Sequence, residues 1–299
     1  MREKRRKTPW GVMVVTVVFV VFLAILYRFT EHGRQNIEDI AHRLADGYIK
    51  EYTVKPPPEG LTMEEALLVQ KEFIQQIGRA YGQAVGYKVG LTNRRVQERF
   101  GIDEPVRGFI LERMLRRSPA TVPFGFGTRL MMEGDLIVEI KDESINRATT
   151  IEEALKGISR VIPFVELPDL LYEEGTRLNA PLVVAINVGA RLGVIGEPID
   201  VEPTKEWLDR LSSFRVALYD QRGEKIAEGT GANVMDHPLN VILWLAKSLK
   251  KQGKKLKRGD IVSVGSITPL LPVKERGTVK AVYRGLSPEG DVELTVTFD

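Results

Sequence analysis

The chain of 299 residues contains no cysteine and only three histidines. The absence of cysteine excludes disulfide bonds, thiolate metal sites and a cysteine nucleophile, although it does not assign the protein to a compartment. Without cysteine and without a histidine cluster, a zinc site is a poor match. With 43% hydrophobic residues, the chain is still long enough to bury a substantial core in one large domain or two small ones.

The positive charge of the chain is confined to its beginning. The formal net charge is +3, but residues 1–28 alone carry six basic residues and one acidic residue. The remainder therefore has a net negative charge, and the basic isoelectric point gives no support for nucleic-acid binding. We expect no nucleic-acid partner.

A long uncharged apolar run extends from Trp10 to Tyr27. At about 1.5 Å per residue it is long enough to cross the hydrocarbon core of a membrane. A signal peptide is the alternative, but the run exceeds the usual apolar region and no small-x-small cleavage site follows Leu26. The basic residues before the run place the N-terminus in the cytoplasm. The pattern predicts a single-pass membrane protein with residues 1–9 in the cytoplasm, an anchor at 10–28, and the catalytic domain outside the cytoplasm.

Helical spacing of apolar residues predicts a tether and first helix within 29–60. A capping box at Thr62–Glu65 starts a second helix that reaches about Tyr81, and a third helix runs from an N-cap at Asp236 to Gly253. Short apolar runs between Gly, Pro, Asn and Asp predict strands. These are 84–91, 108–111, 135–141, 162–167, 182–188, 214–219, 225–230, 261–266, 277–284 and 292–298. Helices followed by many strands predict an α+β domain over 61–299.

Three carboxylates lie in or beside apolar strand-forming runs. Glu133 and Asp135 are two positions apart, so on a strand they point to the same face, and Glu166 closes a second apolar run. Unpaired buried carboxylates are costly, and like charges held close together resist joint ionisation. A divalent cation would resolve both problems, and oxygen ligands suit Mg²⁺ or Mn²⁺. The alternative is carboxylates that face solvent or pair with arginine.

Lys88 lies among apolar residues in the run from Gly86 to Thr92. It is either an edge-strand lysine whose ammonium group reaches water, or an acid–base group that also holds a substrate carboxylate beside a metal. Its position in the sequence does not decide between them.

From about Gln35 to Asp299 the sequence resembles the 2-keto-4-pentenoate hydratases and 4-oxalocrotonate decarboxylases of the fumarylacetoacetate hydrolase superfamily. The resemblance rests on the order and spacing of several short motifs. They are Glu64-Glu-Ala-Leu-Leu-Val-Gln70, Gly86-Tyr-Lys-Val-Gly-Leu-Thr92, Gly101-Ile-Asp-Glu-Pro105, Glu133-x-Asp135, Pro163-Phe-Val-Glu166, Gly231-Ala-Asn-Val-Met-Asp-His-Pro238, Trp244-Leu-Ala246 and Gly259-Asp-Ile-Val-Ser-Val-Gly265.

The resemblance implies a mixed β-sheet roll of the fumarylacetoacetate hydrolase C-terminal type, with N-terminal helices and, here, one preceding transmembrane helix. It also implies Mg²⁺ or Mn²⁺ on Glu133, Asp135 and Glu166, a 2-oxo acid that chelates the metal, homo-oligomeric assembly and a place in aromatic compound catabolism. The metal would polarise the 2-oxo group, after which water adds across a double bond or carbon dioxide leaves. Lys88 matches the active-site lysine, and Asp103 is a weaker match to an acidic residue near the substrate. Two residues fall in a stretch that lines the pocket in relatives, Ser266 and Thr268.

The sequence departs from the family in three respects. The usual Glu-x-Glu is here Glu133-x-Asp135, which is one methylene shorter at the second position. Arg191 follows a stretch near the pocket, where it could bind a second substrate carboxylate or block the site. A membrane anchor is unusual among the relatives.

These features lead to one main hypothesis, a metal-dependent hydratase, or carbon–oxygen lyase. Its substrate would be a small unsaturated 2-oxo acid such as 2-hydroxypenta-2,4-dienoate, the enol form of 2-oxopent-4-enoate. The alternatives are a 2-oxo acid decarboxylase, an acylpyruvate hydrolase, and a catalytically weakened, membrane-tethered binding or scaffold protein. The hydrolases use a histidine with a carboxylate to activate water. None of His32, His42 and His237 lies near the predicted strands, which disfavours the hydrolase.

Overall fold

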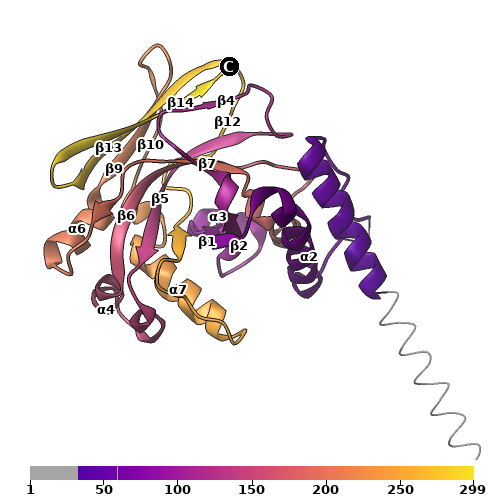
Figure 1. Ribbon diagram of the computed structural model, residues 1–299, viewed down its shortest axis with the longest axis horizontal. Helices are drawn as coiled ribbons and strands as arrows, with labels where there is room; N and C mark the ends of the chain where they lie inside the picture. The colour runs from indigo at the N-terminus through magenta and orange to yellow at the C-terminus, as the bar shows by residue number, and fades with distance from the viewer. Residues whose placement is uncertain (1–32, 59) are drawn as a thin grey trace, which may run out of the picture.

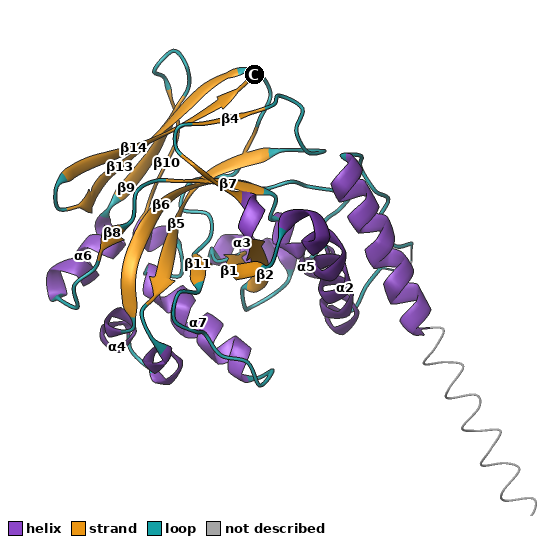
Figure 2. Cartoon of the chain, viewed as in Figure 1, coloured by secondary structure: helices purple, strands orange, loops and turns teal. Residues whose placement is uncertain are grey.

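The computed structural model describes residues 33–58 and 60–299. Within these residues the strands form two sheets, of nine and five strands, flanked by helices (Figures 1 and 2). This arrangement agrees with the mixed α+β fold that the sequence predicts.

The larger sheet contains the strands that carry the candidate site. Its main path is β2 (Val106–Leu111), β1 (Ala84–Gly90), β11 (Ile261–Ser263), β5 (Met131–Ile140), β6 (Ile158–Leu167), β7 (Leu192–Ile195) and β3 (Leu115–Arg117). Two short strands lie off this path, β12 (Leu271–Pro272) beside β5 and β8 (Ile199–Asp200) beside β6. The smaller sheet has the order β10 (Lys225–Thr230), β9 (Arg215–Tyr219), β13 (Gly277–Ser287), β14 (Gly290–Phe298) and β4 (Ala120–Val122).

The helices are mostly short. Residues 33–50 are helical, and the labelled helices are α2 (Met63–Tyr81), α3 (Arg94–Phe100), α4 (Ile151–Lys156), α5 (Ala180–Ala185), α6 (Lys205–Ser213) and α7 (Pro238–Lys250). Four 3₁₀ turns accompany them, η1 (Glu112–Met114), η2 (Glu143–Arg147), η3 (Asn187–Gly189) and η4 (Gly231–Asn233).

Two main hydrophobic clusters stabilise these elements. One joins the two sheets to α4, α6 and α7 through residues such as Leu136, Val216 and Leu245. The other packs the helix over 33–50 against α2 and α5, with Tyr48 edge-on to Phe73 at 5.4 Å between ring centroids. Figure 1 shows these N-terminal helices side by side at one end of the larger sheet.

The predicted transmembrane helix and membrane localisation need correction. In the described ranges 33–58 and 60–299, no helix is long and apolar enough to cross a membrane. The longest labelled helix, α2, alternates a buried apolar face with charged residues such as Glu64, Glu72 and Arg79, as expected of a helix that packs on one side. The predicted span 10–28 lies outside the described residues. We therefore retain neither the single-pass anchor nor the assignment of the catalytic domain to the outside of the cytoplasm.

The predicted strand at 182–188 is also wrong. These residues form the second half of helix α5 and the beginning of the 3₁₀ turn η3. Asn179 provides the N-cap, with its side chain accepting a hydrogen bond from the Leu182 N–H, and Pro181 occupies the first turn. Capping by Asn and an early proline favour a helix. The run is rich in β-branched residues, which favour strands, and the prediction gave them more weight than the helix cap and the proline.

Helix α7 begins one residue later than predicted, with His237 as its N-cap in place of Asp236. The ring Nδ1 of His237 accepts a hydrogen bond from the Leu239 N–H at 3.1 Å, and Nε2 lies 3.0 Å from the Leu208 carbonyl oxygen. One acceptor and one donor are what a neutral imidazole offers. Burial accordingly lowers the pKa of His237 below its usual 6.5.

We predict that His237 makes thermal stability sensitive to acid. Because its folded-state pKa lies below the unfolded value, its stabilising contribution is present above pH 6.5 and is lost as the pH falls through the folded pKa. The melting temperature should therefore fall between pH 7 and pH 5. His237→Asn keeps an N-cap acceptor without the titration and should show a flatter profile. Equal pH dependence in the two proteins would contradict this role of His237.

Candidate functional site

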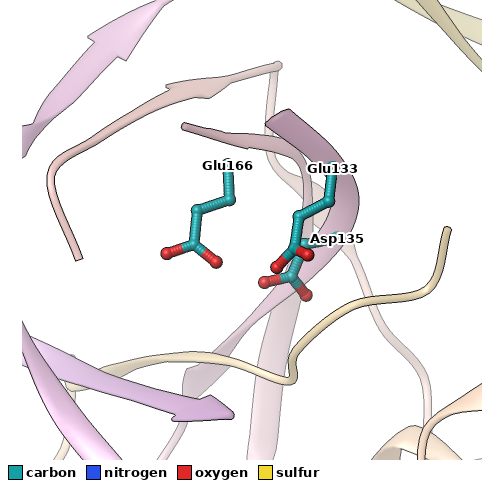
Figure 3. A group of neighbouring side chains, drawn as sticks. All are labelled: Glu133, Asp135 and Glu166. Carbon is teal, nitrogen blue, oxygen red and sulfur yellow. The ribbon is translucent and has the colours of Figure 1, made fainter. Parts of the chain in front are cut away.

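Strands β5 and β6 bring the three predicted carboxylates together. The strands are antiparallel, with Glu133 opposite Glu166 and Asp135 opposite Phe164. Directly opposed residues share a face, so the pairing sets Glu166 against the Glu133–Asp135 pair. Figure 3 shows the three side chains converging on one space. Each offers an oxygen within 4.8 Å of the others, and the side chains are almost completely buried.

Lys88 enters the same space from β1. Strand β1 lies between β2 and β11, and Lys88 is opposite Gly108 on one side and Ser263 on the other. Its Nζ is 2.6 Å from Glu166 Oε1, and the side chain is 5% exposed. The lysine is therefore on an inner strand with its ammonium group against a carboxylate. It is not an edge-strand lysine whose head reaches water.

The last residue of β11 and the segment after it supply hydrogen-bond donors to the other two carboxylates. Ser263 Oγ donates to Asp135 Oδ2, the Gly265 N–H donates to Asp135 Oδ1 at 3.0 Å, and Ser266 Oγ donates to Glu133 Oε2 at 2.6 Å. Gly265 has a φ of +97°, and a Cβ there would lie 2.7 Å from the Val89 carbonyl oxygen. Only glycine fits at this position, and its lack of a side chain lets the backbone N–H come within hydrogen-bond distance of Asp135.

Mutual repulsion and burial oppose ionisation of the cluster. Burial, with the neighbouring Glu166 as the next cause, raises the pKa of Glu133 to about 8 and raises the pKa of Asp135 well above its usual value. Fully ionised, the three carboxylates and the single ammonium leave two negative charges, which is the charge that one divalent cation would balance. Glu166 Oε2 is buried and has no hydrogen-bond partner.

These observations fit a divalent metal. Oxygens on opposite sides of one cation, each 2.0–2.6 Å from it, lie roughly 4 to 5 Å apart, which is similar to the spread of this cluster. The all-oxygen donor set suits a hard cation. Among the residues that the structure describes, no second group of potential ligands of this kind occurs. The buried triad could therefore bind a divalent metal, and the shorter Asp135 still brings an oxygen within 4.8 Å of those of both glutamates. Its role as a ligand stays a prediction.

The structure places the other predicted site residues in three different surroundings. Ser266 belongs to the cluster through Glu133. Thr268 lies beside it, with Oγ1 accepting a hydrogen bond from the Gly134 N–H at 2.8 Å. Asp103 is exposed on the wall of a cleft described below. Their roles in substrate binding and catalysis stay predictions.

Arg191 is placed differently from what either sequence hypothesis assumed. Its guanidinium donates to the Tyr48 carbonyl oxygen and pairs with Glu51 Oε1 at 2.8 Å. The group also lies over the rings of Tyr48 and Phe126, with 4.0 and 4.6 Å to the ring centroids. The side chain is buried and attaches the end of the N-terminal helix to β7. Its contacts are structural, and its predicted role in substrate recognition stays untested.

A cleft of 1260 Å³ lies near the segment that follows β11, and none of Lys88, Glu133, Asp135 and Glu166 lines it. One wall is the segment 92–105, which contains α3, and the other is 232–251, which contains η4 and α7. Both walls touch the segment that follows β11, because Thr92 Oγ1 lies against Gly265 and Asn233 Nδ2 donates to the Ile267 carbonyl oxygen at 2.9 Å. Met235 and Asp236 line the cleft with φ values of 50° and 64°. Such left-handed non-glycine residues cluster at functional sites.

Sequence reasoning missed several residues that shape the site. Ser263 and Gly265 stood within a quoted motif, but Ser263 reaches Asp135 with its side chain and Gly265 with its backbone N–H beyond β11, so no side-chain spacing marked the pair. Asn233 also lay in a quoted motif, but its contact with the Ile267 carbonyl has a sequence separation of 34 residues and leaves no local pattern.

Comparisons with known proteins agree with this geometry, although no family model matches the chain. The chain is 28% identical over 220 residues to the 2-keto-4-pentenoate hydratase of Paraburkholderia xenovorans strain LB400, which covers 72% of this chain and 77% of the relative. It is 25% identical over 226 residues to 4-oxalocrotonate decarboxylase of Pseudomonas putida, covering 76% and 83%. Several further homologues are also named 2-keto-4-pentenoate hydratase, which is a hydro-lyase.

Solved structures show the same fold. The 4-oxalocrotonate decarboxylase of Pseudomonas putida G7, complexed with magnesium and adipate, matches with a TM-score of 0.79 and 24% identity over 89% of this chain and 98% of that one. The same enzyme is known complexed with calcium and acetate. Further neighbours belong to the fumarylacetoacetate hydrolase family. The predicted resemblance to the hydratases and decarboxylases is thus confirmed, and the solved structures of the similar decarboxylase contain magnesium or calcium. Homo-oligomerisation stays a prediction.

We predict that metal binding stabilises the protein more strongly as the pH rises from 6 to 8.5. Without metal, the pKa of Glu133 is about 8 in the folded protein and 4.5 in the unfolded chain. The contribution of Glu133 to the free energy of unfolding is therefore fully present below pH 4.5 and is lost as the pH rises through about 8. The metal-free protein should therefore lose a few degrees of melting temperature over this range, and Mn²⁺ should restore them.

The control is Glu133→Gln, which removes the titrating group. Its metal-free melting temperature should change less between pH 6 and 8.5 than that of the wild type. A Mn²⁺-induced shift of equal size at both pH values would count against a proton-competing carboxylate site.

Proposed function

We propose that this protein is a metal-dependent hydratase acting on a small unsaturated 2-oxo acid such as 2-hydroxypenta-2,4-dienoate. The observation that carries the proposal is the buried cluster of three carboxylates and one lysine, whose uncompensated charge matches a divalent cation. The names of the hydratase homologues support the reaction class. The substrate is our inference from those names.

Glu133, Asp135 and Glu166 would hold Mg²⁺ or Mn²⁺, and Glu166 Oε2 is the oxygen still without a partner. The bound ion would supply Lewis-acid polarisation of a chelated 2-oxo acid. Ser263, Gly265 and Ser266 orient two of the ligands, so that their oxygens are in place before substrate arrives. Such preorganisation lowers the cost of reorganising charge during the reaction.

We assign Lys88 the proton transfers. Its Nζ is fixed against Glu166 Oε1 at 2.6 Å and is shielded from water by the strands on either side. From this position the ammonium group can give a proton to a substrate carbon beside the cluster, and the resulting amine can take one from the attacking water. The cleft between 92–105 and 232–251 is the proposed route for substrate, with Asp103 on its wall.

The decarboxylase is the second candidate, because one curated relative and one similar solved structure carry that name. Its substrate would bring a second carboxylate, and the predicted partner for that group, Arg191, is engaged with Tyr48 and Glu51. We therefore rank hydration first. An acylpyruvate hydrolase ranks lower, because His237 caps α7 and His42 lies on the N-terminal helix.

The proposed function predicts that, with Mg²⁺, the protein consumes 2-hydroxypenta-2,4-dienoate and forms a product heavier by one water. The reason is that polarisation of the 2-oxo group and proton transfer from Lys88 lower the barrier to adding water. Ultraviolet absorbance and mass spectrometry measure the reaction, and EDTA should abolish it. Carbon dioxide release from 4-oxalocrotonate would favour the decarboxylase. Binding of oxalate with Mg²⁺ but no turnover of either substrate would favour a binding protein.

We further predict that Lys88→Met lowers kcat by roughly 10²- to 10⁴-fold, the usual range for loss of a general acid–base group. Binding of Mn²⁺ should be kept, because the three carboxylates remain. The matched control is Lys254→Met, at an exposed lysine beyond α7, which should leave kcat unchanged. If Lys88→Met keeps more than a tenth of wild-type activity, the lysine does not carry the proton.

A further inference from the structure

Tyr283 from the smaller sheet reaches into the strand pair that carries the carboxylates. The residue is on β13 and is completely buried. Its hydroxyl oxygen lies 2.6 Å from the Phe164 carbonyl oxygen and 2.9 Å from the Asp135 carbonyl oxygen, and it accepts a hydrogen bond from the Phe164 N–H at 3.1 Å. One hydroxyl therefore contacts three backbone groups of β5 and β6.

These three groups belong to a single cross-strand pair, Asp135 opposite Phe164. Along β5 the carbonyl groups alternate in direction. Those of Gly134 and Leu136 accept bonds from Ile267 and Val264 on the side of β11, so that of Asp135 points toward β6. The hydroxyl of Tyr283 thus lies between the backbones of the two strands that carry the carboxylates. Asp135 is two residues from Glu133 along β5, and Phe164 is two residues from Glu166 along β6.

The smaller sheet also contacts β5 at the residue between the two ligands. A Cβ at Gly134 would lie 3.0 Å from Val216 Cγ2 on β9 and 3.0 Å from Thr268 Cγ2. The absence of a side chain at Gly134 lets β9 approach, and Tyr283 on the neighbouring β13 completes the contact. The second sheet therefore touches β5 at Gly134 and Asp135, where the metal ligands are.

We propose that Tyr283 is a positioning residue for the metal site. By joining the backbones of Asp135 and Phe164, it fixes the separation of β5 and β6 and with it the distance between the carboxylates of Asp135 and Glu166. The inference rests on the metal site proposed above. The competing explanation is that Tyr283 only fills the core and that its hydroxyl needs some partner, as buried tyrosines do. That explanation predicts a loss of stability without a loss of metal affinity.

The test compares Tyr283→Phe with Tyr172→Phe. Tyr172 is equally buried, and its hydroxyl donates to a backbone carbonyl, that of Leu182, at 3.3 Å, but it lies in the cluster formed by the N-terminal helices. Both variants lose one buried hydroxyl. Electron paramagnetic resonance of Mn²⁺ measures affinity and the symmetry of the bound ion, and thermal unfolding of the metal-free proteins measures stability.

We expect Tyr283→Phe to weaken Mn²⁺ binding roughly tenfold, the lower end of the range for residues that support metal ligands, and to change the spectrum of the bound ion. Tyr172→Phe should leave both unchanged. The inference is overturned if Tyr283→Phe binds Mn²⁺ within twofold of the wild type, or if Tyr172→Phe weakens binding as much. If the wild type itself does not bind Mn²⁺, the proposed metal site fails instead.

Should Tyr283→Phe not unfold cooperatively, wild-type protein labelled with 3-fluorotyrosine replaces it. Mg²⁺ is expected to shift a fluorine resonance, because Tyr283 contacts the backbone of a ligand. Fluorine spectra of all the tyrosines that are identical with and without Mg²⁺ would overturn the inference.

Discussion

The repulsion between three buried carboxylates is the constraint on which the rest of the structure depends. Carboxylates placed this close and this deep do not ionise together without compensation. The sheet order supplies that compensation, because β1, β11, β5 and β6 are consecutive neighbours. Lys88 on β1 reaches Glu166, Ser263 at the end of β11 reaches Asp135, and the Gly265 N–H and Ser266 just beyond β11 reach Asp135 and Glu133. Two negative charges remain for a divalent cation.

The pairing of β5 with β6 and the packing of the smaller sheet on β5 fix the positions of the three carboxylates. The register of β5 and β6 sets Glu133 against Glu166, and a slip by one residue would turn every side chain of one strand to the opposite face. The smaller sheet packs directly on β5 at Gly134, where the lack of a side chain permits close approach. The core between the sheets and the ligand geometry are therefore parts of one packing arrangement.

Local patterns predicted those parts of the site that lie within single strands. The spacing of Glu133 and Asp135 and the apolar run before Glu166 pointed to a shared buried position, whereas the surroundings of Lys88 left open whether it is buried or at a sheet edge. The parallel pairing of β1 with β11 joins residues more than 170 positions apart, and no local pattern reveals it. Helix α3 has no buried residue and hence no apolar face to recognise. The run 182–188 was misread because its β-branched residues outweighed a cap outside the run.

Arg191 shows how tertiary packing engages a residue whose role the sequence leaves open. An isolated buried guanidinium is costly unless its donors are satisfied. Here the Tyr48 carbonyl oxygen and Glu51 accept hydrogen bonds from its terminal nitrogens, its Nε is left without a hydrogen-bond partner, and the rings of Tyr48, Tyr81 and Phe126 lie against it. These contacts attach the N-terminal helix to β7 beside Glu166. Releasing the side chain to bind a second substrate carboxylate would leave these groups unpaired. A second substrate carboxylate would therefore need a cation other than Arg191, and Arg94, Arg95, Lys247 and Lys251 line the cleft.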